Sequence, residues 1–547
     1  MPTTGNMLLA RALVQEGAQA LFYLMGAPIL DASKACGVEG IRMIDVRHEQ
    51  AAAMMAHAYA RVLARPGVCL SSSGPGTVNL STGLANALID AAPVVALGGS
   101  SPVGDYGTDA FQEIDQVAVM RPVTKWADRV YEARRIPEYV HRAFTTASSG
   151  KPGPVYLDLP GDVLYQTVEE AAVVWPDTRQ GCNQYRSAAP QEALDRLLTL
   201  IRHAERPIVI AGSGALWSQA ADHLHCFVNA TGIPFYTTPP ARGLLPEDDA
   251  FCFPGARSKA FAEADLVLII GSRLNYVLGF GQAPRFAANA KLVRIDIDPE
   301  EISRGNQDLG IVGDATTVLR QLCDRLPMYF STANYARWRA TLAAADAAHD
   351  EAQRAVAEQQ SGSIHPLQLC LAVREVLPRN AIVVADGQEI LHYSRQSIRS
   401  FAPGHRLTPG PFGTMGVGVP FALGAKAASP GAPVVVMQGD GSFGLNAMEL
   451  DTAVRHKLPV LVVISLNSGW TADAGDARTG RELACTRYDR LAESLGCHGE
   501  FVTRAEDIRP ALERALLAMQ QGQPALVNVV TDTRARARTT SYARYET

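Results

Sequence analysis

The stretches that decide the fold are VVVMQGDGS, residues 434–442, and LVVISLNSG, residues 461–469. Each opens with an apolar run typical of a buried strand, and each run stops at a polar turn. A helical pattern of apolar residues lies between the two runs. The unit therefore predicts a strand, a helix and a second strand of one parallel α/β sheet.

Two polar side chains follow these strands, Asp440 after the first and Asn467 after the second. Because the carboxyl ends of parallel strands share one edge of the sheet, we expect both side chains to meet there. A carboxylate, an amide oxygen and backbone carbonyls are ligands suited to Mg²⁺. Gly439 and Gly441 let the backbone approach phosphate closely. The pattern predicts a magnesium site that also holds phosphate.

The whole unit, strand, GDGS, helix, strand and Asn, resembles the thiamine-diphosphate motif. The resemblance implies that Asp440, Asn467 and the backbone carbonyl of Gly469 ligate Mg²⁺, which anchors the diphosphate of the cofactor. It also implies that Met415 lies under the cofactor and holds its two rings in a V. A methionine here could be part of the core, but the neighbouring glycines allow close backbone approach and favour the cofactor. The cofactor-binding residues predicted in this way are Gly26, Pro75, Gly413, Met415, Gly439, Asp440, Gly441, Ser442, Asn467, Gly469 and Trp470.

The chain has 547 residues, too many for one hydrophobic core. We predict three α/β domains, each a doubly wound parallel sheet. By the resemblance they are a pyrimidine-binding domain (1–170), a central Rossmann-like domain (190–330) and a diphosphate-binding domain with a C-terminal tail (365–547). An Ala-rich, helix-prone connector precedes the third domain.

The composition excludes several classes of function. A net charge of −5 does not suit nucleic acid, and no apolar run reaches the length of a membrane span. The N-terminus lacks the basic and apolar regions of a signal peptide. The nine cysteines are scattered without a Cys-x-x-Cys pair, so neither disulfides nor zinc are indicated. We expect a cytoplasmic protein without nucleic-acid or membrane partners.

In the first domain, Glu49 stands where a predicted strand passes into an Ala-rich helix. A carboxylate there can simply stabilise a helix N-terminus. The segment RHEQAAA, residues 47–53, resembles the catalytic glutamate segment of the thiamine-diphosphate family. A buried glutamate that hydrogen-bonds the cofactor's pyrimidine nitrogen promotes cofactor activation. In that family the glutamate and the GDG motif come from different subunits, so the resemblance implies a homodimer or homotetramer.

The segment around Gln112 limits the classes of reaction that the chain resembles. Its Ala-Phe-Gln-Glu, residues 110–113, resembles acetolactate synthases and 2-hydroxyacyl-CoA lyases, whose glutamine faces the substrate. Oxalyl-CoA decarboxylases carry Tyr-Glu at the positions of Phe111 and Gln112, and the adjacent His pair of pyruvate-type decarboxylases is missing. The stretch 114–127 also resembles benzaldehyde lyase. A solvated loop remains the alternative for Gln112.

The central domain resembles one that holds FAD in acetolactate synthases, ADP or CoA in the acyl-CoA branch, and nothing in several other relatives. ADP is therefore a possible second cofactor. Arg273 and Arg285 are candidates for CoA phosphates, because arginine binds phosphate in a bidentate manner. Ordinary surface arginines are the alternative at both positions.

Two further candidates lie near the C-terminus. Asp473 stands where pyruvate decarboxylases carry a catalytic glutamate, so it is either an acid/base or a helix cap. The tail that contains Arg538 is either a solvated end or a lid whose arginines close over an acyl-CoA.

The resemblance favours a carbon–carbon lyase that splits a 2-hydroxyacyl-CoA into formyl-CoA and an aldehyde or ketone. The alternatives are a carboligase like benzaldehyde lyase or acetolactate synthase, and an oxalyl-CoA decarboxylase.

Overall fold

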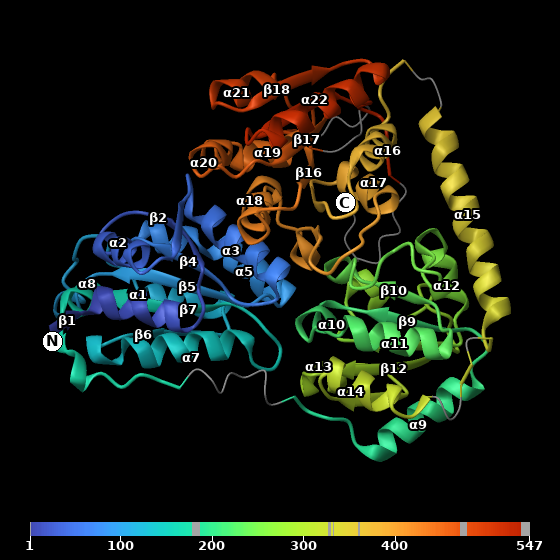
Figure 1. Cartoon of the computed structure of the whole chain (residues 1–547), viewed down its shortest axis with the longest axis horizontal. Helices are drawn as coiled ribbons and strands as arrows, with labels where there is room; N and C mark the ends of the chain where they lie inside the picture. Colours follow the sequence, from blue (N-terminus) through green and yellow to red (C-terminus); the bar gives the residue numbers. More distant parts are fainter. Residues whose placement is uncertain are drawn as a thin grey trace.

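The computed structural model describes residues 2–177, 186–326, 330–331, 333–358, 362–470 and 479–537. Figure 1 shows three α/β bodies, coloured blue, green and orange to red along the chain. Each contains a parallel sheet with helices packed against it. The predicted fold class is therefore confirmed.

The first sheet has six strands in the described residues, in the order β3-β2-β4-β5-β7-β6, and all neighbours are parallel. A short antiparallel pair, β1 and β8, lies beside it. The strands are β1 (Pro2–Thr4), β2 (Ala20–Leu24), β3 (Arg42–Asp45), β4 (Gly67–Ser71), β5 (Val94–Ser100), β6 (Trp126–Arg129), β7 (Val155–Pro160) and β8 (Thr167–Glu169). The helices are α1 (Gly5–Gln15), α2 (Leu30–Val38), α3 (Glu49–Leu63), α4 (Pro75–Asn79), α5 (Ser81–Asp90), α6 (Gln116–Met120), α7 (Ile136–Ser148) and α8 (Gly161–Tyr165).

The central sheet has five parallel strands in the described residues, in the order β10-β9-β11-β12-β13. They are β9 (Pro207–Ala211), β10 (Phe235–Thr237), β11 (Leu266–Ile270), β12 (Lys291–Asp296) and β13 (Leu309–Val312). The helices are α9 (Gln191–His203), α10 (Ser213–Trp217), α11 (Ala221–Thr231), α12 (Arg257–Glu263), α13 (Pro299–Ser303) and α14 (Ala315–Cys323). The long connector helix α15 (Ala336–Glu358) runs from this domain to the third (Figure 1).

The third sheet has six parallel strands in the described residues, in the order β15-β14-β16-β17-β19-β18. They are β14 (Ile382–Asp386), β15 (Arg406–Leu407), β16 (Val434–Gly439), β17 (Leu461–Leu466), β18 (His498–Val502) and β19 (Ala525–Val530). The helices are α16 (Pro366–Val376), α17 (Glu389–Ser397), α18 (Gly418–Ala428), α19 (Asp440–Asn446), α20 (Glu449–Arg455), α21 (Tyr488–Ser494) and α22 (Ile508–Gln520).

Helices α3 and α18 join the first and third domains into one apolar core. Their alanines and glycines let the two backbones approach closely, and a Cβ at Gly424 would come within 2.2 Å of the Met55 carbonyl oxygen. Because α3 begins at Glu49, this packing fixes the position of that residue relative to the third domain.

No helix among the described residues is long and apolar enough to cross a bilayer.

Candidate cofactor site

Three neighbouring strands of the third sheet end at one edge, and their ends form a pocket. β14 and β17 flank β16, with Asp386 beside Gln438 and Gly439 beside Ser465 in the register. Asp440 opens α19 directly after β16, and Asn467 follows β17. The sequence therefore brings Asp440 and Asn467 together as predicted for parallel strands.

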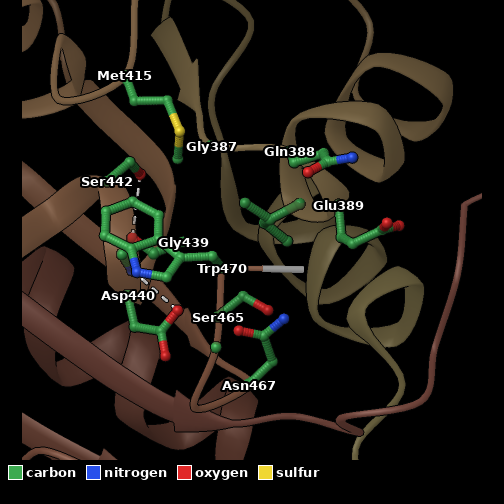
Figure 2. Close-up of a pocket in the computed structure, with 13 residues that line it drawn as sticks. Gly387, Gln388, Glu389, Met415, Gly439, Asp440, Ser442, Ser465, Asn467 and Trp470 are labelled. Atoms are coloured by element: carbon green, nitrogen blue, oxygen red, sulfur yellow. Dashed lines mark hydrogen bonds between the residues drawn. The ribbon is translucent and has the colours of Figure 1, made fainter. Parts of the chain in front are cut away.

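Three oxygen atoms converge at this edge, and Figure 2 shows the two side chains that supply two of them, Asp440 and Asn467. The side-chain oxygen of Asn467 lies 3.0 Å from Asp440 Oδ1 and 3.0 Å from the carbonyl oxygen of Gly469. In the protein alone, rotating the amide would replace this contact between acceptors with two hydrogen bonds. A cation among the three oxygens would instead favour the amide orientation described here, because it attracts all of them.

The spacing of these oxygens can be compared with that around magnesium. In an octahedral Mg²⁺ site with metal–oxygen distances of about 2.1 Å, neighbouring ligand oxygens lie about 3.0 Å apart. Asp440 is 1% exposed, and its Oδ2 has no hydrogen-bond partner among the described residues. Burial raises the pKa of Asp440 to about 6, since a buried carboxylate lacks the stabilisation of solvent. The donor set and its spacing therefore fit Mg²⁺.

The walls of the pocket come from other predicted residues and from a segment that sequence reasoning missed. Met415, Gly439, Gly441, Ser442 and Trp470 line it together with the three oxygen donors. A Cβ at Gly441 would lie 2.8 Å from the Trp470 ring, so glycine is needed there for the indole to pack. The missed lining residues are Gly387, Gln388, Glu389, Ile390 and Ser465.

The missed segment follows β14, and its turn is held by Asp386. This buried carboxylate accepts hydrogen bonds from the backbone of Gly387 (2.6 Å) and Gly418 (2.9 Å) and from Gln438 (3.0 Å). Burial raises its pKa to about 6. The Asp-Gly at the end of the apolar run 382–387 was the available signal, because a third strand end on the same edge of the sheet can reach the same pocket.

The residues predicted in the first domain gather on a different edge. Glu49 is 7% exposed, and its Oε2 accepts a hydrogen bond from Asn79 at 2.9 Å. Its Oε1 faces Gly76, where a Cβ would lie 3.2 Å away, and no described residue donates to it. Gly76 belongs to the turn that contains Pro75, and a Cβ at Gly26 would touch Ser72 of the same turn at 2.6 Å. Among the described residues, none of this edge lines the pocket of the third domain.

Gln112 lies against the same turn, because its Oε1 accepts a hydrogen bond from Ser73 Oγ at 2.7 Å. Its φ of 59° is in the left-handed region, which is unusual for a residue other than glycine. Gln116, which sequence reasoning did not single out, is buried and donates to Asp158 (2.8 Å) and Tyr156 (3.0 Å). It also accepts from the Gly74 backbone, so it holds the turn in place.

Glu449 of α20 links the third domain to the backbone that precedes Glu49. It is 1% exposed, and its Oε1 accepts hydrogen bonds from the backbone of Arg47 (3.0 Å) and His48 (3.1 Å), immediately before Glu49. Its Oε2 accepts from Thr452 Oγ1 at 2.7 Å. Burial raises the pKa of Glu449 to about 7. The third domain thus holds the backbone that leads into Glu49.

The two predicted arginines of the central domain lie in different surroundings. Arg273 donates to the carbonyl oxygen of Ile89 in the first domain and lowers the pKa of the neighbouring Asp90. Arg285 is buried and lies near Arg257, and its charge lowers the pKa of that residue. Arg273 and Arg285 therefore have different surroundings, and of the two only Arg285 belongs to a larger group of arginines.

That group is the arginine cluster, defined as Arg242, Arg257, Arg285 and Arg395. Burial and the neighbouring arginines lower the pKa of Arg257 to about 9, and similar causes lower that of Arg395. Nε and Nη2 of Arg257 have no hydrogen-bond partner among the described residues. Arg242 is already paired with Glu247, and Arg395 belongs to α17, whose first turn lines the cofactor pocket. The cluster therefore carries an excess of positive charge that suits a polyanion.

Two predicted site residues, Asp473 and Arg538, lie outside the described residues. The last described residue of the C-terminal segment, Ala537, donates its backbone N–H to Glu389 of the pocket at 2.7 Å. The chain that leads to Arg538 is therefore anchored beside the pocket.

Comparison with protein families places three successive domains on the chain. They are the N-terminal TPP binding domain (residues 3–119), the central domain (194–322) and the C-terminal TPP binding domain (390–529) of thiamine pyrophosphate enzymes. The chain belongs to the thiamine pyrophosphate enzyme family. The predicted family is therefore confirmed, and the described pocket lies largely within the C-terminal TPP binding domain.

Relatives in this family carry three different activities in their names. A 2-hydroxyacyl-CoA lyase of Arabidopsis thaliana is 33% identical, with 96% of this chain and 95% of the relative covered. An acetolactate synthase large subunit of Mycobacterium tuberculosis is 34% identical, with coverage of 96% and 95%. An oxalyl-CoA decarboxylase of Escherichia coli is 32% identical, with coverage of 97% and 95%. These similar values identify a thiamine pyrophosphate enzyme without choosing among the reactions.

Proposed function

We propose that the protein is a thiamine-diphosphate-dependent carbon–carbon lyase that splits a 2-hydroxyacyl-CoA into formyl-CoA and an aldehyde or ketone. The observation that carries this choice is the arginine cluster, whose unpaired Arg257 donors call for an anion. The phosphates of CoA supply such anions, and arginine binds them in a bidentate manner. A relative named 2-hydroxyacyl-CoA lyase, 33% identical to this chain, is compatible with this choice.

Helix α17 connects the cofactor pocket with the arginine cluster. Glu389, in the first turn of α17, lines the cofactor pocket, and Arg395 lies six residues further along the same helix. This separation corresponds to about 9 Å along a helix axis. A substrate whose reacting carbon is in the pocket can therefore extend along α17 towards the cluster.

At the metal end, Asp440, Asn467 and the Gly469 carbonyl would hold Mg²⁺, and Ser442 and the glycine turns would surround the diphosphate. When bound, thiamine diphosphate supplies a carbon nucleophile and takes up the electron pair of the bond that breaks. Met415 would support the cofactor, as it lines the pocket on the side opposite Asn467 (Figure 2). The single carboxylate of Asp440 provides the negative charge that the other two donors lack.

At the proton-transfer end, the free Oε1 of Glu49 would accept or donate a proton at the pyrimidine ring. Glu49 is shielded from solvent, and the hydrogen bond from Asn79 fixes the orientation of its other oxygen. Gln112 would orient the oxygen of the substrate, since Ser73 holds its side chain at this edge. Because this edge does not line the pocket of its own chain, we propose that a second copy of the chain completes each site in a homodimer or homotetramer.

The proposed reaction is tested by incubating the holoenzyme with 2-hydroxyacyl-CoAs and measuring formyl-CoA, with benzoin and pyruvate in parallel. We expect formyl-CoA from the CoA substrates. Product from benzoin or pyruvate alone would instead support a carboligase, the second candidate, which the 34% identical acetolactate synthase relative favours. An oxalyl-CoA decarboxylase is less well supported, since Phe111-Gln112 stands where those enzymes carry Tyr-Glu.

The role of the arginine cluster is tested separately by Arg257→Gln. We expect KM for the acyl-CoA to rise about tenfold with a smaller change in kcat, since charge-assisted hydrogen bonds contribute about 1.5–3 kcal/mol. Arg304→Gln, on an exposed part of the same domain, is the matched control. An unchanged KM in Arg257→Gln would remove the cluster from substrate binding.

A further inference from the structure

A second cavity, of about 460 Å³, lies apart from the cofactor pocket. It lies between the connector helix α15, helix α16, strand β14 and the segment after α17, and Asp248 of the central domain closes one side. Its volume is within the range of about 300–1,000 Å³ that is typical of small-molecule sites. None of its lining residues is shared with the cofactor pocket or the arginine cluster.

Four arginines and two aspartates line this cavity. Arg379 pairs with Asp248 at 2.8 Å, and Arg399 pairs with Asp350 at 3.2 Å. Each aspartate therefore already balances one arginine.

The other two arginines, Arg354 and Arg374, are not balanced. No carboxylate in the described part of the chain pairs with either of them, and Arg374 donates only to the neutral carbonyl oxygen of Ser397 at 3.2 Å. The lining therefore carries about two positive charges that have no protein counter-ion. A ligand with two negative charges would neutralise them.

The rest of the cavity is apolar. Its buried surface is formed by Ala381, Val383 and Ile398, each less than 9% exposed. Phe401 adds an aromatic wall, with the Arg379 guanidinium 4.2 Å from its ring centroid. If a simple inorganic ion bound here, the apolar part of the lining would stay exposed to water. The lining therefore favours a ligand with both a charged and an apolar part.

We propose that this cavity binds a small organic dianion with an apolar body, either a phosphate monoester or a dicarboxylate, and that this ligand is an effector of the enzyme. The charged end pairs with Arg354 and Arg374, and the body packs on Val383, Ile398 and Phe401. The site is additional to the acyl-CoA substrate and does not depend on the identity of that substrate.

The effector role follows from two elements that reach both cavities. Strand β14 lies between Ala381, in the second cavity, and Gly387, in the cofactor pocket. Helix α17 begins at Glu389, in the cofactor pocket, and is followed by Ile398, in the second cavity. A ligand that packs against one end of both elements biases the position of their other end. Such coupling is reciprocal. The ligand changes the affinity of the enzyme for thiamine diphosphate by the same factor by which thiamine diphosphate changes the affinity of the enzyme for the ligand.

The binding test is calorimetry on the full-length enzyme loaded with thiamine diphosphate and Mg²⁺, with phenyl phosphate and phenylsuccinate as probes. We expect at least one of them to bind about tenfold more tightly than inorganic phosphate or benzyl alcohol. Which probe binds more tightly distinguishes a phosphate from a dicarboxylate ligand. Equal affinity for inorganic phosphate would contradict the apolar contribution.

Variants locate the site. Arg374→Gln should weaken the tighter probe about tenfold and Arg354→Gln about threefold, because solvent screens a charge pair at the half-buried Arg374 less than one at the exposed Arg354. Arg337→Gln, at an exposed position of the same helix α15, should have no effect. Unchanged affinity in Arg354→Gln/Arg374→Gln would overturn the site. Displacement of the probe by CoA, or weakening by Arg257→Gln, would assign it to the arginine cluster instead.

The effector role has its own readout. At a saturating concentration of the probe, the apparent affinity of the apoenzyme for thiamine diphosphate should change at least about threefold, and Arg374→Gln should abolish the change. Binding of the probe without any change in cofactor affinity would overturn the effector role. The acyl-CoA reaction is not used in either test, so failure here is distinguishable from failure of the proposed function.

Discussion

A buried acid opens both α19 and α3, each after a strand, and these two junctions differ in how complete they are. At the start of α19, Asp440 meets Asn467 and the Gly469 carbonyl within one domain, at oxygen separations of 3.0 Å. At the start of α3, Glu49 is held by Asn79 and has a second oxygen with no donor among the described residues. The pocket beside the first junction contains no residue of the second.

The two ends of the site are therefore built in different ways. The metal end depends on the register of adjacent parallel strands, which one domain specifies by itself. The proton-transfer end lies outside that pocket, and in the proposed function a second copy of the chain would bring the two ends together. Mutations at the first junction should therefore abolish cofactor binding, whereas mutations at the second should spare binding and slow the reaction.

The largest effect is expected from Asp440→Asn. This change keeps the shape of the side chain and removes the one negative charge among the three donors. We expect the affinity for thiamine diphosphate with Mg²⁺ to fall at least about 100-fold and turnover about 1,000-fold or more, measured by calorimetric titration and steady-state kinetics. Asp507→Asn, at an exposed helix cap, is the control. Near-normal cofactor affinity in Asp440→Asn would contradict the metal assignment.

The second-largest effect is expected from Glu49→Gln. The amide cannot exchange a proton at the pyrimidine, and general acid–base catalysis contributes about 10²–10⁴-fold. We therefore expect turnover to fall at least about 100-fold while the cofactor affinity stays within about threefold of the unmodified enzyme. If affinity and turnover fell together, the two junctions would not be separable in the way described.

A smaller effect is expected from Glu449→Ala. The alanine leaves the backbone N–H groups of Arg47 and His48 without their buried acceptor, and this allows the start of α3 to shift. We expect kcat to fall about tenfold with little change in cofactor affinity. Glu449→Gln keeps an acceptor oxygen and should restore most of the activity. Equal losses in the two variants would exclude a positioning role.

The smallest effect concerns the dependence of stability on pH. Burial raises the pKa of Glu449 from an ordinary 4.5 to about 7, so its contribution to the free energy of unfolding is complete below pH 4.5 and is lost as the pH rises through about 7. Relative to Glu449→Gln, the unmodified protein should lose stability on the order of 2 kcal/mol between pH 5 and pH 8. Denaturant unfolding of both proteins measures this difference, and parallel curves would show that Glu449 does not titrate there.

Much of the fold could be predicted because apolar runs mark buried parallel strands. The runs at Val68, Val94 and Val155 correspond closely to β4, β5 and β7. The short strands β6 and β15 gave no such signal, because Trp126–Arg129 is only half-buried and Arg406–Leu407 has two residues. Length and continuous burial, rather than β-propensity alone, therefore decided which strands could be found.

The part of the site that could be predicted consists of metal-binding residue types placed directly after strands. Asp440 and Asn467 each follow one of two adjacent strands, so the rule that parallel strand ends share one edge of the sheet located both. Arg257 of the central domain approaches Arg395 of the third domain, and Glu449 of the third domain contacts the first. No local pattern distinguishes these three residues from ordinary charged ones. The charge excess of the arginine cluster and the contact of Glu449 with the backbone before Glu49 become visible only when the domains are packed.

The most direct test of the account is complementation between two inactive variants, Glu49→Gln and Asp440→Asn. Co-expressed with separate affinity tags and purified through both, they form mixed oligomers in which one site combines an intact Glu49 edge with an intact metal pocket. If the two junctions come from different chains, activity should recover to about a quarter to a half of the unmodified value, depending on how the chains mix. Mixed oligomers that stay inactive would contradict the claim, and so would activity in either variant alone.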